Sequence, residues 1–344
     1  RVVDHVWTLR GRVFIASRDQ QGLNPVLSVL QPDGISWDHR PGVTVTAAYA
    51  DRNGRIWIGT SDGVRLYLPS GGWDNLANRI GSGPHGEVRA ISADSDGRVW
   101  IVSDSGLTLF DRNRFVTTLN SQNAGLPSGR LTSLAIDSGD ALWVGSDTGL
   151  AHVEAGTTTR VFGLADGLPS VGISDVVQLG MGRFAISTPA GAALFDGTHF
   201  DRQTLPPGTN SASPRLAVDD LGNLWAGNAV LTGTGWKGYW EESSGLRGLQ
   251  IADVTADQAG RVWFAHGTAG GLSMRGVYLP PLRDAVPILH DYSPRLGSSG
   301  DVLTITGSGF GASANELTVT IGGERVSIRT VQDDMIAVTV GDTT

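Results

Sequence analysis

The sequence contains no cysteine, a single lysine and no long run of apolar residues. The absence of cysteine excludes a disulfide framework, a thiolate zinc site and a cysteine nucleophile. Lys237 is the only lysine among 26 basic residues, and the net charge is −8, so we expect no nucleic-acid partner. No stretch approaches the ~18 apolar residues that a membrane span requires, and we therefore expect no direct membrane insertion.

Glycine and tryptophan are abundant instead. The 344 residues include 48 glycines and 10 tryptophans, while only 17% of the residues are charged. Disordered chains combine low hydrophobicity with high charge, so this composition indicates a folded protein with many tight turns. A chain of this length commonly forms about two domains.

One short phrase recurs along the first part of the chain. Its clearest copy, DRNGRIWIGT, begins at Asp51, and further copies begin at Asp94, Asp137, Asp219 and Asp257. Two weaker copies carry phenylalanine in place of tryptophan. The aromatic residues of the seven copies recur every 38 to 43 residues: Phe14, Trp57, Trp100, Trp143, Phe184, Trp225 and Trp263. A period of this length indicates a repeat architecture.

Each repeat has the pattern of four short antiparallel strands. Turn residues separate alternating apolar stretches, and no segment has helical periodicity. Four strands per repeat, seven times over, predict a seven-bladed β-propeller spanning residues 1–284, in an all-β protein. We interpret the seven recurrent aromatics as packing between blades. The outer strand of the seventh blade is expected near residues 277–279.

The repeats resemble a known family. The phrase GLPSGRLTSLAIDSGDALWVGSDTGLAHV, from Gly125 to Val153, is similar to the two-component regulator propeller repeat, and Gly-Leu-Pro-Ser recurs at Gly167. This resemblance implies an extracytoplasmic sensor region of a bacterial signalling protein, often responding to glycans, or part of another surface protein. It places the chain at the cell surface, outside the cell or in the periplasm.

Residues 285–344 form a different module. Tyr292-Ser-Pro, the run GSGFG from Gly307 and Ile321-Gly-Gly resemble an IPT/TIG domain, which implies an immunoglobulin-like β-sandwich. The chain stops before that family's last strand, so the domain is expected to be incomplete. Either the chain is part of a longer protein, or a partner chain donates the strand to the open edge. Residues 282–286 are expected to form a short, stiff linker.

The candidate ligand-binding residues come from the innermost strands, which line the axis of a propeller. Aligning the seven copies places Asp4, His5, Arg89, Asp175, Arg215 and Asp253 at the channel, and His266 at a loop on the same face. Arginines there would donate paired hydrogen bonds to a polar ligand, and carboxylates would accept from hydroxyls. The alternative is a water-filled channel whose charges balance. Extra aromatics at Trp236, Tyr239 and Trp240 either stack on sugars or are buried under the blade.

Metal and cofactor sites are not indicated. The histidines lack ligand spacing, and each Asp-x-x-Gly turn offers too few oxygens for calcium, so we expect neither metal nor cofactor. We predict a non-enzymatic binding or assembly module of a larger bacterial surface or sensor protein, with a glycan or a protein as partner. Two alternatives stay open: a propeller lyase or hydrolase acting through the channel carboxylates and histidines, and a structural surface-layer or filament subunit.

Overall fold

The computed structural model describes residues 2–31, 36–68, 72–74, 76, 83–180, 182–209, 212–239, 246, 250–257, 260–267, 271–276, 288–293, 300–308, 319–321, 324–332 and 335–340. Among these residues the regular structure is almost entirely β-strand, as the all-β prediction requires. The one helical segment described is a 3-10 turn, η1 (Leu164–Asp166).

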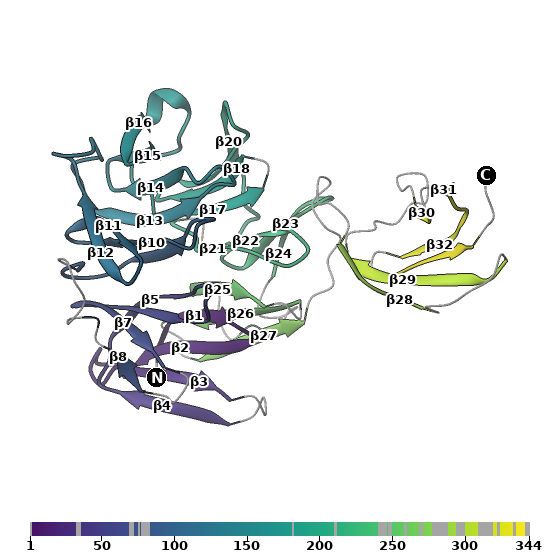
Figure 1. Ribbon diagram of the computed structural model, residues 1–344, viewed down its shortest axis with the longest axis horizontal. Helices are drawn as coiled ribbons and strands as arrows, with labels where there is room; N and C mark the ends of the chain where they lie inside the picture. The colour runs from purple at the N-terminus through teal and green to yellow at the C-terminus, as the bar shows by residue number, and fades with distance from the viewer. Residues whose placement is uncertain are drawn as a thin grey trace.

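Seven sheets of consecutive antiparallel strands make up the first part of the chain (Figure 1). The first sheet contains β1 (Val2–Leu9), β2 (Arg12–Arg18), β3 (Val26–Leu30) and β4 (Trp37–Pro41), and the second contains β5 (Val45–Ala50), β6 (Ile56–Thr60), β7 (Gly63–Tyr67) and β8 (Trp73–Asp74). The third sheet contains β9 (Ala90–Ala93), β10 (Val99–Ser103), β11 (Gly106–Asp111) and β12 (Arg114–Leu119). The fourth contains β13 (Leu131–Ile136), β14 (Leu142–Ser146), β15 (Gly149–Glu154) and β16 (Thr157–Phe162). The last three contain β17 (Asp175–Gly180), β18 (Arg183–Thr188), β19 (Gly191–Phe195) and β20 (Phe200–Gln203); β21 (Leu216–Val218), β22 (Leu224–Ala226), β23 (Ala229–Thr232) and β24 (Gly235–Gly238); and β25 (Ile251–Ala256), β26 (Arg261–His266) and β27 (Leu272–Gly276). The strand predicted at 277–279 lies outside the described residues.

The first strand of each sheet is the innermost one, and these strands form a closed ring. Each of β1, β5, β9, β13, β17, β21 and β25 contacts the next, and β25 contacts β1. The ring therefore has seven blades, which confirms the number predicted from the repeat. At its closure Thr8 Oγ1 donates a hydrogen bond of 2.5 Å to the carbonyl of Ala256 on β25.

The recurrent aromatic of each blade is buried between blades. All seven have at most 8% of their surface exposed. Trp57 on β6 lies 4.9 Å from the ring of Phe110 in the next blade, and Trp143 on β14 lies 4.6 Å from Phe184. These edge and tilted contacts are the favourable geometry for aromatic pairs, so the period of the sequence is the period of blade packing.

A buried or partly buried carboxylate accompanies every recurrent tryptophan. The indole N–H of Trp57 donates to Asp51 Oδ2 at 2.9 Å, across six residues of the blade's own turn. The same bond joins Trp100, Trp143, Trp225 and Trp263 to Asp94, Asp137, Asp219 and Asp257, at 3.1, 3.3, 3.0 and 3.0 Å. The two phenylalanine copies have Thr8 and Gln178 in the corresponding position. Among the seven blades, aspartate is thus present only where the recurrent aromatic is a tryptophan, whose indole N–H needs an acceptor in the core.

Electrostatics at this turn depend on the residue four positions after the aspartate. Burial raises the pKa of Asp51, but hydrogen bonds from Trp57 and Arg55 outweigh burial and hold that pKa below its usual value. Asn223 replaces the arginine beside Asp219, and there burial prevails and raises the pKa of the carboxyl. Arg98 and Arg261 repeat the arrangement of Arg55.

The second module is also built of strands. One sheet has the order β28 (Ile288–Ser293), β29 (Val302–Ser308), β33 (Met335–Thr339) and β32 (Ile328–Gln332), and β30 (Thr320–Ile321) pairs with β31 (Glu324–Arg325). A small core contains Ile305, Val326, Ile336 and Val338. The predicted linker at 282–286 lies outside the described residues.

Candidate functional site

The innermost strands carry a recurrent β-bulge near the point where they enter the ring. The register with the second strand shifts between Val3 and His5, and again between Val45 and Ala47. Equivalent shifts occur in β13 and β25. A bulge inserts one residue and turns its side chain away from the regular alternation. Thr46 lies at such a shift, and its hydroxyl donates a 2.5 Å hydrogen bond to the carbonyl of Val88 in the next blade.

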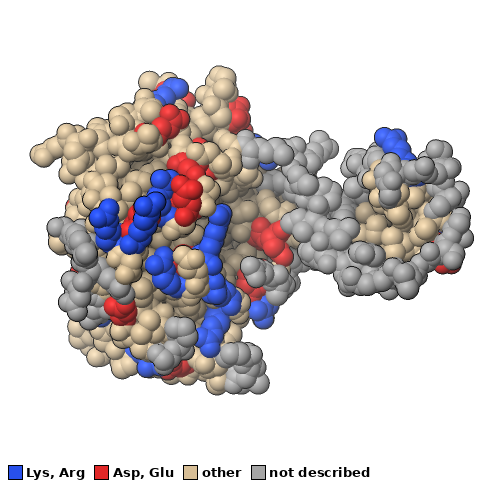
Figure 2. Space-filling model, viewed as in Figure 1, with Lys and Arg blue, Asp and Glu red and all other residues tan. Residues whose placement is uncertain are grey.

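A polar cavity of about 510 Å³ lies at the centre of the ring, lined by residues from all seven blades. Figure 2 shows arginine and carboxylate side chains gathered close together on the face of the propeller turned to the viewer. The volume is within the range of small-molecule sites. The polar residues that line the cavity are His5, Thr46, Glu87, Arg89, Arg130, Thr132, Ser174, Asp175, Arg215, Asp253 and Thr255.

Asp253 is held by neighbours on both sides of the ring closure. Its Oδ2 accepts hydrogen bonds from the backbone N–H of Val6 at 3.2 Å, and it lies 3.3 Å from His5 Nδ1. Its Oδ1 accepts from the N–H of Val254 at 3.0 Å. The carboxylate therefore joins the seventh blade to the first while it faces the cavity.

Asp175 occupies the equivalent place two blades earlier. Its oxygens accept from the backbone N–H groups of Leu216 and Val176, at 3.0 and 2.9 Å. Burial raises the pKa of Asp175 to about 6, while the charge of Arg215 opposes this rise and the charge of Asp253 adds to it. The carboxyl is therefore poised to exchange a proton near neutral pH.

Arg215 lies between these two carboxylates in the order of the ring. It is partly buried and lines the cavity. Within the part of the chain that the structure describes, no hydrogen bond or ion pair holds its guanidinium, because both carboxylates are already satisfied by backbone N–H groups. Its charge opposes the rise that burial causes in the pKa of Asp175, and its N–H groups can donate to an acceptor on a ligand.

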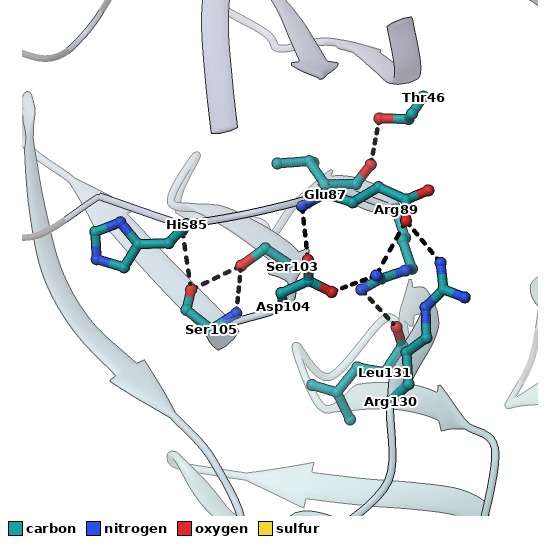
Figure 3. A network of polar contacts seen from close by, with 10 residues as sticks. Thr46, His85, Glu87, Arg89, Ser103, Asp104, Ser105, Arg130 and Leu131 are labelled. Carbon is teal, nitrogen blue, oxygen red and sulfur yellow. Dashed lines mark hydrogen bonds and ion pairs between the residues drawn. The ribbon is translucent and has the colours of Figure 1, made fainter. Parts of the chain in front are cut away.

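A network of four charged residues lies on the third and fourth blades, and three of them line the cavity (Figure 3). Arg89, whose side chain is only 10% exposed, pairs with Glu87 at 3.1 Å and also with Asp104 on the β10–β11 turn. Glu87 Oε2 further accepts from Arg130 Nη2 at 2.7 Å. Hydrogen bonding to Arg89 and to the N–H of Glu87 lowers the pKa of Asp104. The network fixes both arginines in place.

Five of the seven predicted ligand residues line the cavity: His5, Arg89, Asp175, Arg215 and Asp253. Asp4 does not, and pairs instead with Arg18 at 2.9 Å on the surface. His266 is fully buried, and its Nε2 lies 2.8 Å from Ser273 Oγ. The alignment missed two charged lining residues, Glu87 and Arg130. They are 43 residues apart, the spacing of the repeat itself, so they occupy equivalent positions before two innermost strands.

The extra aromatics of the sixth blade are packing residues where they are described. Tyr239 is buried, with its ring stacked 5.6 Å from that of Trp225. The Trp236 indole donates to Gln203 Oε1 at 3.0 Å. Trp240 lies outside the described residues.

Two kinds of feature are absent from the described residues. These residues contain no group of three or more histidine, aspartate or glutamate side chains placed to hold a metal ion. They also contain no helix with the length and apolar character needed to cross a bilayer.

Comparison with family models identifies two kinds of module. The two component regulator propeller repeat matches residues 39–62 and 82–105, and the IPT/TIG domain matches residues 287–344. Both assignments agree with the resemblance read from the sequence. No curated protein sequence matches the chain.

Several solved structures share the fold at low sequence identity. The extracellular domain of a hybrid two-component system of B. thetaiotaomicron is 18% identical, with a TM-score of 0.64 over 89% of this chain and 46% of that one. Virginiamycin B lyase from Staphylococcus aureus is 14% identical, with a TM-score of 0.60 over 79% and 94%. PorZ, a surface component of the type-IX secretion system of Porphyromonas gingivalis, is 13% identical, with a TM-score of 0.56 over 91% and 42%. The chain thus spans less than half the length of the first and third structures.

Proposed function

Because the chain joins two component regulator propeller repeats to an IPT/TIG domain, we propose that it is an extracytoplasmic binding module of a larger bacterial surface or sensor protein. Its ligand is a glycan, bound at the central cavity of the propeller. The ligand hydroxyls would accept from guanidinium groups and donate to carboxylates.

The observation that carries this proposal is Arg215. The cavity has the size of a ligand site, and its charges come from three arginines and three carboxylates, so it offers both hydrogen-bond donors and acceptors to a polar ligand. Within that wall Arg215 alone among the three arginines has no ion-pair partner in the described residues. A water-filled channel would leave this guanidinium to solvent, whereas a hydroxyl-rich ligand would fill its hydrogen bonds.

The comparisons support the location rather than the ligand. One similar structure is an extracellular domain and another belongs to a bacterial surface component, although identities of 13–18% carry over only the fold. An extracytoplasmic location is also consistent with the absence of cysteine, which leaves no thiol to oxidise.

Arg215→Gln tests the proposal. We expect the wild-type protein to bind members of a glycan array, and Arg215→Gln to weaken that binding about tenfold, since a hydrogen bond to a charged group contributes about 1.5 kcal/mol or more. Arg112→Gln is the control, because Arg112 is 90% exposed on the β11–β12 turn and does not line the cavity. Equal binding by the two variants would exclude the cavity as the site, and capture of proteins with no glycan bound would favour a protein partner.

A second candidate is a polysaccharide lyase or hydrolase, and the observation in its favour is the raised pKa of Asp175 in a cavity that also contains the His5–Asp253 pair. A proton acceptor near neutral pH suits general acid–base chemistry. The lyase among the similar structures shows that the fold can host such a reaction. Incubating the protein with polysaccharides and measuring the appearance of new chain ends tests it, with Asp175→Asn and His5→Gln expected to remove any activity.

A further inference from the structure

A second hollow adjoins the central cavity. It has a volume of about 420 Å³ and lies between the β10–β11 turn and the loop that connects β12 to β13. Arg89 and Arg130 line both spaces, so the two adjoin at this pair of side chains. The remaining polar lining consists of Ser103, Asp104, Ser105, Asn120, Ser121 and Ser128.

The walls of this second hollow are held in place before any ligand arrives. Asn120 Oδ1 accepts from the backbone N–H groups of Gln122 and Asn123, at 2.9 and 3.2 Å, and closes the turn of the loop. The N–H of Thr158 on β16 donates to Ala124 at 2.9 Å and ties the loop to the next blade. A preorganised wall loses little entropy when it binds.

The chemistry exposed in the second hollow points to an anion. Arg130 is 54% exposed, and Glu87 accepts a hydrogen bond from its Nη2. The charge of Arg130 also lowers the pKa of Asp104, while Nε and Nη1 have no hydrogen bond among the described residues. Glu87 lines the central cavity but not the second hollow. The hollow therefore contains two guanidinium groups and a single carboxylate, Asp104, which is already paired with Arg89.

Serine hydroxyl groups also line the second hollow. Ser121 and Ser128 are exposed at the rim, and no described residue hydrogen-bonds their side chains. The second N–H of Arg130 Nη2 can donate to a carboxylate together with the N–H of a neighbouring guanidinium nitrogen, giving two parallel hydrogen bonds. Serine hydroxyls match the hydroxyls of a sugar ring.

We infer that the second hollow is a subsite for an acidic sugar unit, so that the ligand is a glycan chain whose uronate carboxylate binds Arg130 while a neighbouring unit occupies the central cavity. This inference rests on the proposed function, because it extends the same site. It adds two properties that the central cavity alone does not require. The ligand must be longer than one sugar, and it must carry a carboxylate.

The test compares acidic and neutral oligosaccharides of increasing length by titration calorimetry on the full chain. The probes are monomers to hexamers prepared from polygalacturonate and alginate, and the corresponding neutral galactan and glucan series. We expect affinity for the acidic series to rise once a chain can reach both spaces. We expect Arg130→Gln to lower that affinity about tenfold. Arg130→Lys should restore only part of the loss, because lysine cannot form the bidentate pair.

The outcomes separate the two proposals. If Arg215→Gln weakens binding but Arg130→Gln behaves like the Arg112→Gln control at every length, the second subsite is refuted and the central site stands. If only the neutral series binds the wild-type protein, the acidic specificity is refuted. If neither series binds, the glycan proposal and this inference both fail.

Discussion

The pairing of each buried indole with an aspartate gives a quantitative test of how the blades are held. Trp57 is fully buried, and Asp51, which accepts its N–H, is 3% exposed. Trp57→Phe removes the donor and leaves a ring that fits the slot, since Phe14 and Phe184 occupy the same slot in two other blades. Asp51 keeps its bonds to Arg55 in this variant.

The expected cost has two parts. A hydrogen bond to a charged acceptor contributes about 1.5–3 kcal/mol, and the space left by the smaller ring costs about 1 kcal/mol more. Asp51→Ala should cost at least as much, because it leaves the indole N–H and a backbone N–H of the turn unsatisfied. The double variant reproduces the phenylalanine blades, so its cost should fall short of the sum of the single costs by about 1.5–3 kcal/mol.

The measurement is urea-induced unfolding followed by circular dichroism for the wild type and three variants. Trp7→Phe is the matched control, because Trp7 on β1 has no hydrogen bond to its indole among the described residues, and it should cost far less. Costs that simply add, or a Trp57→Phe cost equal to that of Trp7→Phe, would refute the view that the aspartate is there to satisfy the indole.

The remaining predictions concern the cavity and its surroundings. Because the pKa of Asp175 is raised from 3.8 to about 6 in the folded protein, the free energy of unfolding should fall as pH rises through that interval, by up to about 3 kcal/mol, and then level off. Asp175→Asn should remove this slope in urea titrations at a series of pH values, and an unchanged slope would assign it to another group. Gly86 has φ +70°, and a Cβ there would lie 2.3 Å from Asp104 Oδ2, whereas Gly97 has φ +78° and open space around it. Gly86→Ala should therefore lower thermal stability more than Gly97→Ala, which carries only the cost of the left-handed backbone, about 1–2 kcal/mol; equal effects would show that the loop can move away from Asp104.

The fold could be predicted because its determinants are local and repeated. A buried aromatic every 38 to 43 residues, with turn residues on either side, is visible in a single sequence, and it fixes both the blade and the number of blades. The hydrogen bond from Trp57 to Asp51 was not predicted, although the two residues recur together, because the turn alone already explained the aspartate.

The candidate site could be predicted only in part, for reasons of side-chain length and position. The alignment chose residues between two apolar anchors on each innermost strand, and short side chains there do reach the cavity. Glu87 and Arg130 precede their strands and enter the cavity because their side chains are long. His266 is buried and occupies the repeat position of Thr60 and Ser146. In those two blades the hydroxyl donates to the carbonyl of the glycine three residues later, so residues at this position stabilise the turn and do not reach the cavity.

Because β1 to β4 form one blade in sequence order, no sheet with four described strands borrows a strand from the far end of the chain. The ring is joined by lateral contacts such as Thr8 with Ala256 and Val6 with Asp253. The strand pairing within each of these sheets therefore does not depend on which two blades the chain leaves unconnected. A circular permutant whose propeller starts at the second blade and ends with the first would preserve each of those sheets, and would exchange the present seam for a covalent connection.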